Sequence, residues 1–512
     1  MSTWTDFAWI VDLALISEYP AALQLSPDHR PIASARNAGI SMNFQASQGI
    51  SQAGETVRIE SPAMTISQAT GCGPAESGLA SREPTTIDGT SLEEGIGLLE
   101  EVVDEIYWLD RSPFLAASAR SCFGAGRGLE VHSISPLSTV DGDGLTMAAA
   151  RAVCVAFAPE HGPSAGEWAA AKRLPLLAPD SAASAVAADK LDVLAVFADA
   201  DIETPEFVRV PSDGRAAARQ YWPDTWEAVV VQRRENNLIG RGTRFARNHD
   251  ELQECLDTWA GRELRLGRYV DGPSVTVTAC VAGNTTIVSA VSHQLVGVPG
   301  LTTVWGSHCG NQLVAPTDLP DGAYENIRAT AARVGDQLRR RGYRGVFGLD
   351  LVLERDRPLA IEINPRFQTV VSLVQAAEQR AGLLPSLGLH VLACLLPELP
   401  VRTVVAPVPT LGQLVVHADR DRQLGTLPDS GTYRLGSGAP VLGESRCLAD
   451  LPADHALLWA QTRPGAQVKE GDELMLIQLS EPVATLHAHP RLTPTAAGWV
   501  TAVSACLGGS PC

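Results

Sequence analysis

One stretch decides the fold of this chain: Gly345-Val-Phe-Gly-Leu-Asp350-Leu-Val-Leu-Glu-Arg-Asp-Arg-Pro-Leu-Ala-Ile-Glu362-Ile-Asn364-Pro-Arg366. Two runs of alternating residues, 348–354 and 358–364, flank a short charged turn, which predicts a β-hairpin. A turn centred on Asp356 places Asp350 opposite Glu362 and Val352 opposite Ala360. The odd-numbered positions then form the core face: Leu349, Leu351, Leu353, Leu359, Ile361 and Ile363.

The other face of the hairpin carries Asp350, Glu362 and Asn364. Carboxylates directly across a strand pair lie about 5 Å apart at Cβ and repel, so a cation is expected between them. Two carboxylates and an amide oxygen suit Mg²⁺ shared with phosphate oxygens. Arg366 follows Pro365, which ends the strand, and its guanidinium suits a phosphate or an acyl phosphate. The alternative, a hairpin whose charges face solvent, fits the ordered run Asp, Glu-x-Asn-Pro-Arg less well.

The hairpin resembles the metal-binding end of the ATP-grasp superfamily, whose late signature is a strand Asp followed by Glu-x-Asn and often Pro-Arg. Members of that superfamily use ATP to activate a carboxylate as an acyl phosphate and then join it to a nucleophile, usually an amine. The resemblance implies that Asp350 and Glu362 bind Mg²⁺, with Glu362 bridging two ions and Asn364 holding the second; Mn²⁺ is an alternative metal.

The same resemblance implies an α/β (α+β) fold class, the ATP-grasp fold. The expected domains are an N-terminal α/β pre-ATP-grasp domain at 1–184, an ATP-grasp domain at 185–400 and a small β-rich C-terminal domain at 401–512. Within the second domain we expect a lid subdomain at about 185–263 and a metal-binding, catalytic subdomain at about 264–400.

Composition narrows the class of protein. The chain has 512 residues, 45% of them hydrophobic, with no run of eighteen apolar residues, so a soluble protein of several domains is expected. The net charge of −18 argues against a nucleic-acid partner. The ten cysteines show no C-x-x-C pair, which predicts reduced thiols, and the N-terminus lacks a basic signal-peptide region. A cytoplasmic location follows, with no membrane partner; a homodimer is compatible with the sequence.

Phosphate contacts are predicted in two places. The chain has only three lysines, and Lys190 opens a helix ahead of Thr204-Pro205, as in the entry segment of ATP-grasp proteins. The alternative for Lys190 is an exposed helix lysine. The strand 229–232 then leads into a glycine-rich loop, whose backbone N–H groups suit phosphate oxygens. The resemblance assigns this loop as the lid and implies ATP contacts from Gln232, Gly240, Gly242 and Thr243.

One departure from the family concerns charge. The family usually has a second lysine where this chain has Gln232, so we expect Arg233 or Arg241 to compensate. The stretch that contains Arg268 and Val270 resembles the hinge strand of the family, over which adenine lies. The resemblance implies that backbone groups of Arg268 and Val270 bind the base. Acidic side chains common in the family are replaced there by Gly267 and Ser274, which bears on ribose contact.

The acceptor side is predicted on the strand that contains His293 and Gln294. This run resembles the His-Gln-Lys run of biotin carboxylases, but Leu295 replaces the lysine. His293 as a buried structural histidine is the alternative. The segment after residue 400 resembles the β-rich tail of related ligases and has no Met-Lys-Met biotin site. No Walker A, H-E-x-x-H or G-x-S-x-G motif occurs in the sequence.

Four further predictions concern local structure. Apolar residues from Leu92 to Ile106 at helical spacing predict a helix with Ser91 as its N-cap. A second helix should present Ile327, Ala331, Val334 and Leu338 as one stripe and end at Gly342. Strands are expected at 153–157 and 174–177. The segment from Ala33 to Gly89 is expected to be rich in loops or partly irregular, and the glycine-rich run 124–128 to be a turn.

These observations favour an ATP- and Mg²⁺-dependent carboxylate-amine ligase of the ADP-forming type, most similar to actinobacterial peptide ligases of specialised metabolism such as antibiotic biosynthesis. Its partners would be a small-molecule carboxylate and an amine or amino acid. A carboxyphosphate-forming carboxylase and a non-catalytic nucleotide-binding scaffold are the alternatives. The sequence names neither substrate.

Overall fold

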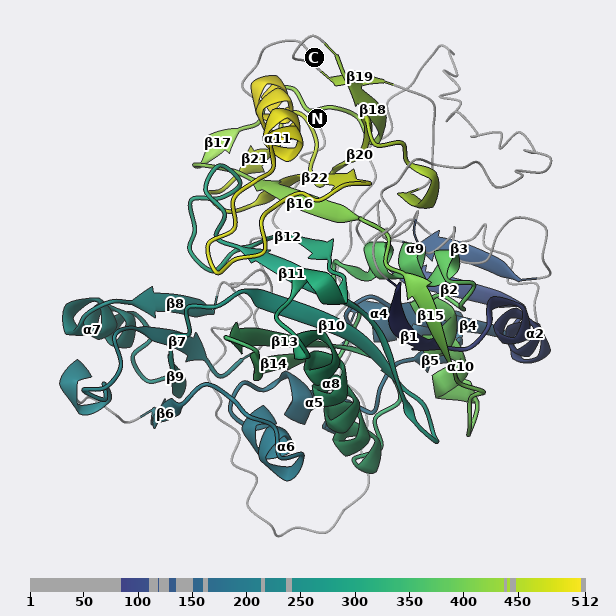
Figure 1. The fold of residues 1–512 in the computed structure, drawn as a ribbon, viewed down its shortest axis with the longest axis horizontal. Helices are drawn as coiled ribbons and strands as arrows, with labels where there is room; N and C mark the ends of the chain where they lie inside the picture. The colour runs from purple at the N-terminus through teal and green to yellow at the C-terminus, as the bar shows by residue number, and fades with distance from the viewer. Residues whose placement is uncertain are drawn as a thin grey trace, which may run out of the picture. The chain divides into compact units, whose positions relative to one another are not determined.

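The computed structural model describes residues 84–109, 118, 129–134, 151–159, 164–212, 217–235, 242–436, 440–442 and 448–507. A ten-stranded sheet organises this part of the chain, in the order β14-β13-β10-β11-β12-β16-β22-β20-β18-β19 (Figure 1). Every neighbouring pair in it is antiparallel. Its strands are β10 (Ser274–Val281), β11 (Thr286–Val296), β12 (His308–Leu313), β13 (Gly345–Glu354), β14 (Arg357–Asn364), β16 (Gly412–His417), β18 (Gly431–Leu435), β19 (Pro440–Leu442), β20 (His455–Ala460) and β22 (Glu473–Leu479).

Two four-stranded sheets accompany the central one. The first is parallel, in the order β3-β2-β4-β5, and the second is antiparallel, in the order β6-β9-β7-β8. Their strands are β2 (Glu105–Leu109), β3 (Glu130–Ile134), β4 (Ala152–Ala156), β5 (Leu176–Leu177), β6 (Phe207–Val210), β7 (Val229–Arg233), β8 (Thr243–Ala246) and β9 (Leu264–Arg268). Two-stranded pairs complete the set: β1 (Pro84–Gly89) with β15 (Arg402–Pro407), and β17 (Arg422–Gln423) with β21 (Gln467–Val468).

Helices cover these sheets. They are α2 (Leu92–Val102), α4 (Ser164–Lys172), α5 (Ser181–Ala188), α6 (Val193–Asp199), α7 (His249–Thr258), α8 (Ala323–Arg340), α9 (Val371–Arg380), α10 (Ser386–Leu395) and α11 (Pro494–Leu507), with short 3₁₀ turns η2 (Ala218–Gln220), η4 (Pro316–Asp318) and η5 (Leu448–Asp450). The longest, α8, packs on β10, β11 and β14 (Figure 1). Its predicted stripe is confirmed, because Ile327, Ala331, Val334 and Leu338 are all fully buried. Gly342 follows the helix in the left-handed region, at φ 86°.

Helix α2 begins as the sequence predicts and ends earlier. The Ser91 Oγ accepts a hydrogen bond from the Glu94 N–H, which confirms the N-cap. The helix ends at Val102, and Ile106 lies in β2 of the parallel sheet. The prediction of a helix through Ile106 is therefore wrong at its end, since a buried strand residue and a helix residue can satisfy the same spacing.

The two strands predicted near residues 153–157 and 174–177 are confirmed as β4 and β5, each shifted slightly or shortened. The loop-rich segment predicted up to Gly89 ends in strand β1 (Pro84–Gly89), so that prediction is wrong there, because the segment pairs with the distant strand β15. Predictions for 1–83, for the glycine-rich run 124–128 and for Gly240 and Arg241 lie outside the described residues.

Most of the described cysteines are free thiols. Within the described ranges, Cys154, Cys255, Cys280, Cys309 and Cys394 are free thiols, whereas Cys506 forms a disulfide, so the expectation of reduced thiols throughout is wrong there. Among the described helices, none is both long enough and apolar enough to cross a bilayer.

The segment after residue 400 continues the central sheet. Strand β16 pairs with β12 on one side and with β22 on the other. The backbones approach closely at Gly310, whose φ is 133°; a Cβ there would lie 2.0 Å from the Gln413 carbonyl oxygen. Only glycine fits at that junction.

Candidate active site

A cavity of about 1230 Å³ is lined by both antiparallel sheets, with residues of β7, β8 and β9 from one sheet and of the β13–β14 hairpin from the other. Most of the residues that the sequence predicts for the site line it. They are Lys190, Gln232, Thr243, Arg268, Val270, Gln294, Asp350, Glu362, Asn364 and Arg366.

The hairpin places its acidic residues as predicted. Asp350 pairs directly with Glu362, and Gly348 with Asn364. Nearer the turn the register shifts by one residue, so Val352 pairs with Leu359, and the predicted pairing of Val352 with Ala360 is wrong. The cause is a two-residue turn, Arg355-Asp356, followed by a bulge at Ile361 that restores the register before Glu362.

The bulge also changes which face some side chains occupy. Leu349, Leu351, Leu353 and Ile363 join the core beneath α8, as expected. Leu359 and Ile361 instead pack with Val270 and Val352 in a small apolar cluster. Val270, Val352 and Ile361 line the cavity, so this cluster gives it an apolar wall that the simple alternation does not predict.

Asp350 is buried in a shell of neutral donors. Its Oδ1 accepts hydrogen bonds from the Thr276 hydroxyl (2.6 Å) and Gln368 Nε2 (2.9 Å), and its Oδ2 accepts one from Asn364 Nδ2 (3.0 Å). Burial and then the neighbouring charge of Glu362 raise the pKa of Asp350 to about 6. A cation beside this carboxyl would reverse that shift.

Glu362 has a cationic partner. Its Oε2 forms an ion pair with Lys190 Nζ, and the Lys190 side chain is only 5% exposed. Burial acts to raise the pKa of Glu362, but the charges of Lys190, Arg366 and Arg265 outweigh it and leave that pKa below its ordinary value. The Lys190 ammonium therefore pairs with one of the two carboxylates in this structure, and the Mg²⁺ expected between them stays a prediction.

Lys190 is held in place by its backbone. It lies in the turn between α5 and α6, just before Asp192, the N-cap of α6. Its N–H donates to the Arg234 carbonyl oxygen (3.0 Å), and the Arg234 guanidinium in turn pairs with Asp189, Asp192 and Glu263. Lys190 is not the exposed helix lysine of the alternative interpretation.

Arg366 stands at the end of the hairpin beside Asn364. Its Nη2 donates to Asn364 Oδ1 (3.0 Å), and its guanidinium lies over the Phe157 ring at 5.9 Å. The Asn364 amide thus bridges Arg366 and Asp350. Both guanidinium and amide face the cavity, where a phosphate oxygen or a metal ion could meet them.

The opposite wall supplies further polar groups. Gln232 is buried on β7 and pairs with Thr243 on β8, and both line the cavity. Gly242 does not line it; its carbonyl accepts a hydrogen bond from the Arg233 N–H (2.9 Å). Arg268 at the hinge is ion-paired with Glu354 (2.7 Å), which ties β9 to the hairpin turn.

Gln294 and His293 are successive residues of β11, so their side chains lie on opposite faces of the sheet. Gln294 lines the cavity, and its Nε2 lies 3.5 Å from Asp350 Oδ2. His293 is fully buried and does not line the cavity, and burial lowers its pKa to about 4. The prediction that His293 faces the substrate is not met by this geometry, because the period of two along β11 turns the ring away.

Several cavity residues were not predicted. His308 lines the cavity, with its Nε2 2.8 Å from Asn311 Oδ1, and burial lowers its pKa to about 4. The aromatic rings of Tyr269, Phe245 and Trp305 form a continuous row, with Phe245 4.9 Å from each neighbour. Trp305 and His308 both belong to a glycine-rich run in the sequence, and that composition was the only local signal for a loop at the site.

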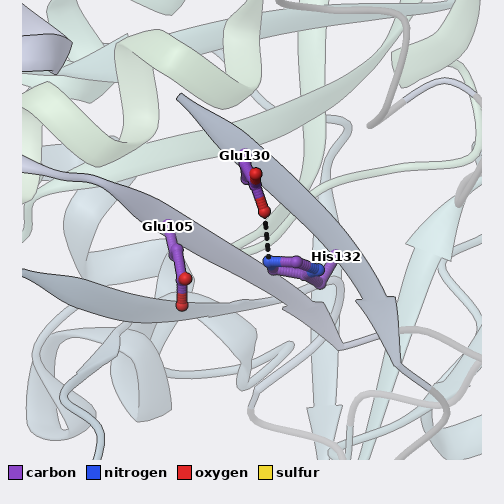
Figure 2. A group of neighbouring side chains, drawn as sticks. All are labelled: Glu105, Glu130 and His132. Atoms are coloured by element: carbon purple, nitrogen blue, oxygen red, sulfur yellow. Dashed lines mark ion pairs between the residues drawn. The ribbon is translucent and has the colours of Figure 1, made fainter. Parts of the chain in front are cut away.

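A second group of possible metal ligands lies elsewhere. Figure 2 shows Glu105 on β2 with Glu130 and His132 on β3. His132 lies 3.5 Å from Glu130 and stacks on the Tyr107 ring, and Glu105 accepts a hydrogen bond from the Tyr107 hydroxyl. Each side chain therefore has a protein partner, and we assign no site there.

Part of this chain is similar to proteins of known family. Residues 187–370 match the family described as the ATP-grasp domain. N5-carboxyaminoimidazole ribonucleotide synthase of Synechococcus elongatus is 25% identical over 188 residues, which cover 37% of this chain and 45% of that protein. The chain thus spans less than half the length of this relative.

Two solved structures resemble the fold. N5-carboxyaminoimidazole ribonucleotide synthetase of Thermus thermophilus aligns with a TM-score of 0.50 at 18% identity, covering 80% of this chain and 99% of that one. The biotin carboxylase domain of 2-oxoglutarate carboxylase from Hydrogenobacter thermophilus, solved with MgADP, ADP and bicarbonate, aligns with a TM-score of 0.51 at 13% identity, covering 74% and 87%. The fold is therefore the ATP-grasp fold, and the family match to the ATP-grasp domain is limited to residues 187–370 of this chain.

Proposed function

We propose that this protein is an ATP- and Mg²⁺-dependent, ADP-forming ligase that activates a carboxylate as an acyl phosphate and couples it to an amine. One observation carries the proposal: Asp350 and Glu362 face one another in a large cavity, flanked by Lys190 and Arg366. Paired carboxylates between two cationic groups suit a metal-bound polyphosphate better than they suit an apolar ligand.

The residues present fit magnesium. Asp350 and Glu362 offer carboxylate oxygens and Asn364 an amide oxygen, which are the hard donors this ion prefers. Bound there, the ion would neutralise charge on the phosphate oxygens during phosphoryl transfer. Metal binding would change two present interactions: Lys190 would turn from Glu362 to a phosphate oxygen, and the ion would lower the raised pKa of Asp350.

The remaining wall of the cavity would hold the nucleotide. The apolar cluster at Val270, Val352 and Ile361 suits the face of a purine base, next to the hinge backbone at Arg268. Gln232 and Thr243 would donate to phosphate oxygens, and we include the neighbouring loop glycines in this assignment. Arg366 would stabilise the transferred phosphoryl group, because it stands at the strand end beyond the two carboxylates.

A carboxylase-type reaction, with bicarbonate as the activated acid, is the second candidate. The similarity of 188 residues to N5-carboxyaminoimidazole ribonucleotide synthase favours it. The ligase assignment is supported by Leu295, which occupies the lysine position of the biotin-carboxylase run and is fully buried in the core. Peptide-bond formation in specialised metabolism remains our more specific proposal for the ligase.

ADP release from ATP distinguishes these reactions. We expect ADP and phosphate in step when a panel of carboxylic and amino acids is supplied, and a hydroxamate when hydroxylamine replaces the amine. Release that depends on bicarbonate alone would favour the carboxylase. AMP and pyrophosphate as the stoichiometric products would refute both candidates, because the paired carboxylates and Arg366 are proposed to act at the γ-phosphate.

A matched pair of variants tests the assignment of the metal site. Glu362→Gln should lower ADP release by at least about 100-fold, since it removes a charged metal ligand. Asp356→Asn makes the same chemical change in the exposed turn of the same hairpin and should leave the rate unchanged. Equal rates for both variants would contradict the site.

A further inference from the structure

Arg265 is a buried cation that lies beside Gln232, the β7 position where the ATP-grasp family usually has a lysine. Gln232 on β7 pairs directly with Arg265 on β9, so the two side chains lie on the same face of that sheet. Both line the cavity. Of the two arginines that the sequence suggested as replacements, Arg233 packs against Trp259 and does not line the cavity, and Arg241 lies outside the described residues.

Arg265 is held without a full set of partners. The residue is 2% exposed, and its Nη1 donates to the Ile361 carbonyl oxygen (2.8 Å), the bulge residue of the hairpin. Its Nε is buried without a hydrogen-bond partner among the described residues, and no described carboxylate lies within ion-pair distance. A guanidinium has five N–H donors, so one carbonyl leaves most of its capacity unused.

Burial of the Arg265 guanidinium is unfavourable unless an anion binds to it. Burial lowers the pKa of Arg265 to about 10, against the opposing effect of Glu362, so the group stays charged at neutral pH. A buried charge without an ion-pair partner destabilises the fold. The Phe207 ring, 5.7 Å from the guanidinium carbon, covers one of its faces. Arg265 lines the cavity together with Glu362 and Gln232.

We propose that Arg265 is the second polyphosphate-binding cation of this site and takes, from the neighbouring strand, the place of the lysine absent at Gln232. The inference rests on the proposed nucleotide function. The planar guanidinium would bind oxygens of one phosphate group through two N–H donors, whereas Lys190 meets the polyphosphate as a point charge. The bulge residue Ile361 serves this arrangement, because its carbonyl oxygen accepts the hydrogen bond that holds the guanidinium.

Calorimetric titration with ADP and with adenosine, at fixed Mg²⁺, tests the proposal. Arg265→Met should weaken ADP binding by about 10- to 100-fold and leave adenosine affinity within twofold, because the contact is to phosphate. Arg265→Lys keeps the charge and should lose less. Arg244→Met, an exposed arginine on β8 outside the cavity, is the matched control and should bind both ligands as the wild type does.

A second substitution on the paired strand β7 tests more directly whether the lost charge explains the weaker ADP binding. Gln232→Lys added to Arg265→Met places an ammonium opposite the vacated position and should restore ADP affinity to within about fivefold of wild type. A merely structural role predicts equal loss of ADP and adenosine binding and no rescue, and that result would overturn the inference. Unchanged ADP affinity in both Arg265→Met and Arg265→Lys would overturn it as well. A wild-type protein that binds neither ligand would instead refute the nucleotide function itself.

Discussion

Replacing Lys190 with methionine isolates the energy of the buried ion pair. Methionine keeps most of the apolar stem, so little packing is lost, but the Glu362 carboxylate loses its closest cation. Removing one member of a buried pair costs about 3 to 5 kcal/mol. Glu362 keeps 23% side-chain exposure and the longer-range charges of Arg366 and Arg265, so we expect the low end of that range, about 3 kcal/mol at pH 8.

The pH dependence gives this prediction its sign. In the wild type the pKa of Glu362 is lowered, so its contribution to stability is present above its ordinary value of 4.5 and is lost as the pH falls through the lowered pKa. The difference in the free energy of unfolding between wild type and Lys190→Met should therefore be largest at neutral pH and shrink below pH 4.5.

Equilibrium urea unfolding at pH 4 and pH 8 measures that difference, with the m-value checked for each protein. Lys469→Met changes an exposed lysine in the same way and should alter the free energy of unfolding by less than about 0.5 kcal/mol. A deficit in Lys190→Met below about 1 kcal/mol at pH 8, or one equally large at both pH values, would refute the reasoning.

Three other positions test how side chains pack in this fold. Burial raises the pKa of Glu378 to about 7, so the wild type should lose about 2 to 3 kcal/mol as the pH rises from 4.5 to 7, and Glu378→Gln should flatten that slope in urea unfolding. A slope unchanged by the substitution would count against this. Gly348→Ala places a Cβ 1.7 Å from Gln368 Oε1 and should pull Gln368 from Asp350, which would lower ADP release by about 10- to 100-fold. Gly97→Ala, on α2 with nothing within 4 Å, should be neutral or stabilising by up to about 1 kcal/mol in thermal unfolding.

The β13–β14 hairpin shows which features of the site could be predicted from the sequence. Alternation and a charged turn were enough to predict Asp350 opposite Glu362, because a period of two fixes the face of every strand residue. They could not reveal the bulge at Ile361, since no glycine or proline marks it. The apolar wall made by Val270, Val352 and Ile361 depends on that bulge and was missed with it.

Residues that meet through pairing of distant strands were harder to predict. Arg265 reads in the sequence as one charged residue of an alternating strand, and only the pairing of β9 with β7 places it beside Gln232. The ion pair of Lys190 with Glu362 joins residues 172 positions apart. His293 failed for the opposite reason: its residue type suggested a site role, while its strand parity, which was readable, already opposed that of Gln294.

The junction at Gly310 has a consequence for anyone who wishes to work with a shorter protein. A fragment ending near residue 400 would strip β16 from β12 and leave a row of unsatisfied N–H and C=O groups along a strand that is buried on both faces. Such an exposed edge is a template for intermolecular pairing, so the fragment should aggregate. The segment that matches the ATP-grasp family, residues 187–370, also lacks β16, so we expect it to aggregate in the same way when it is expressed alone.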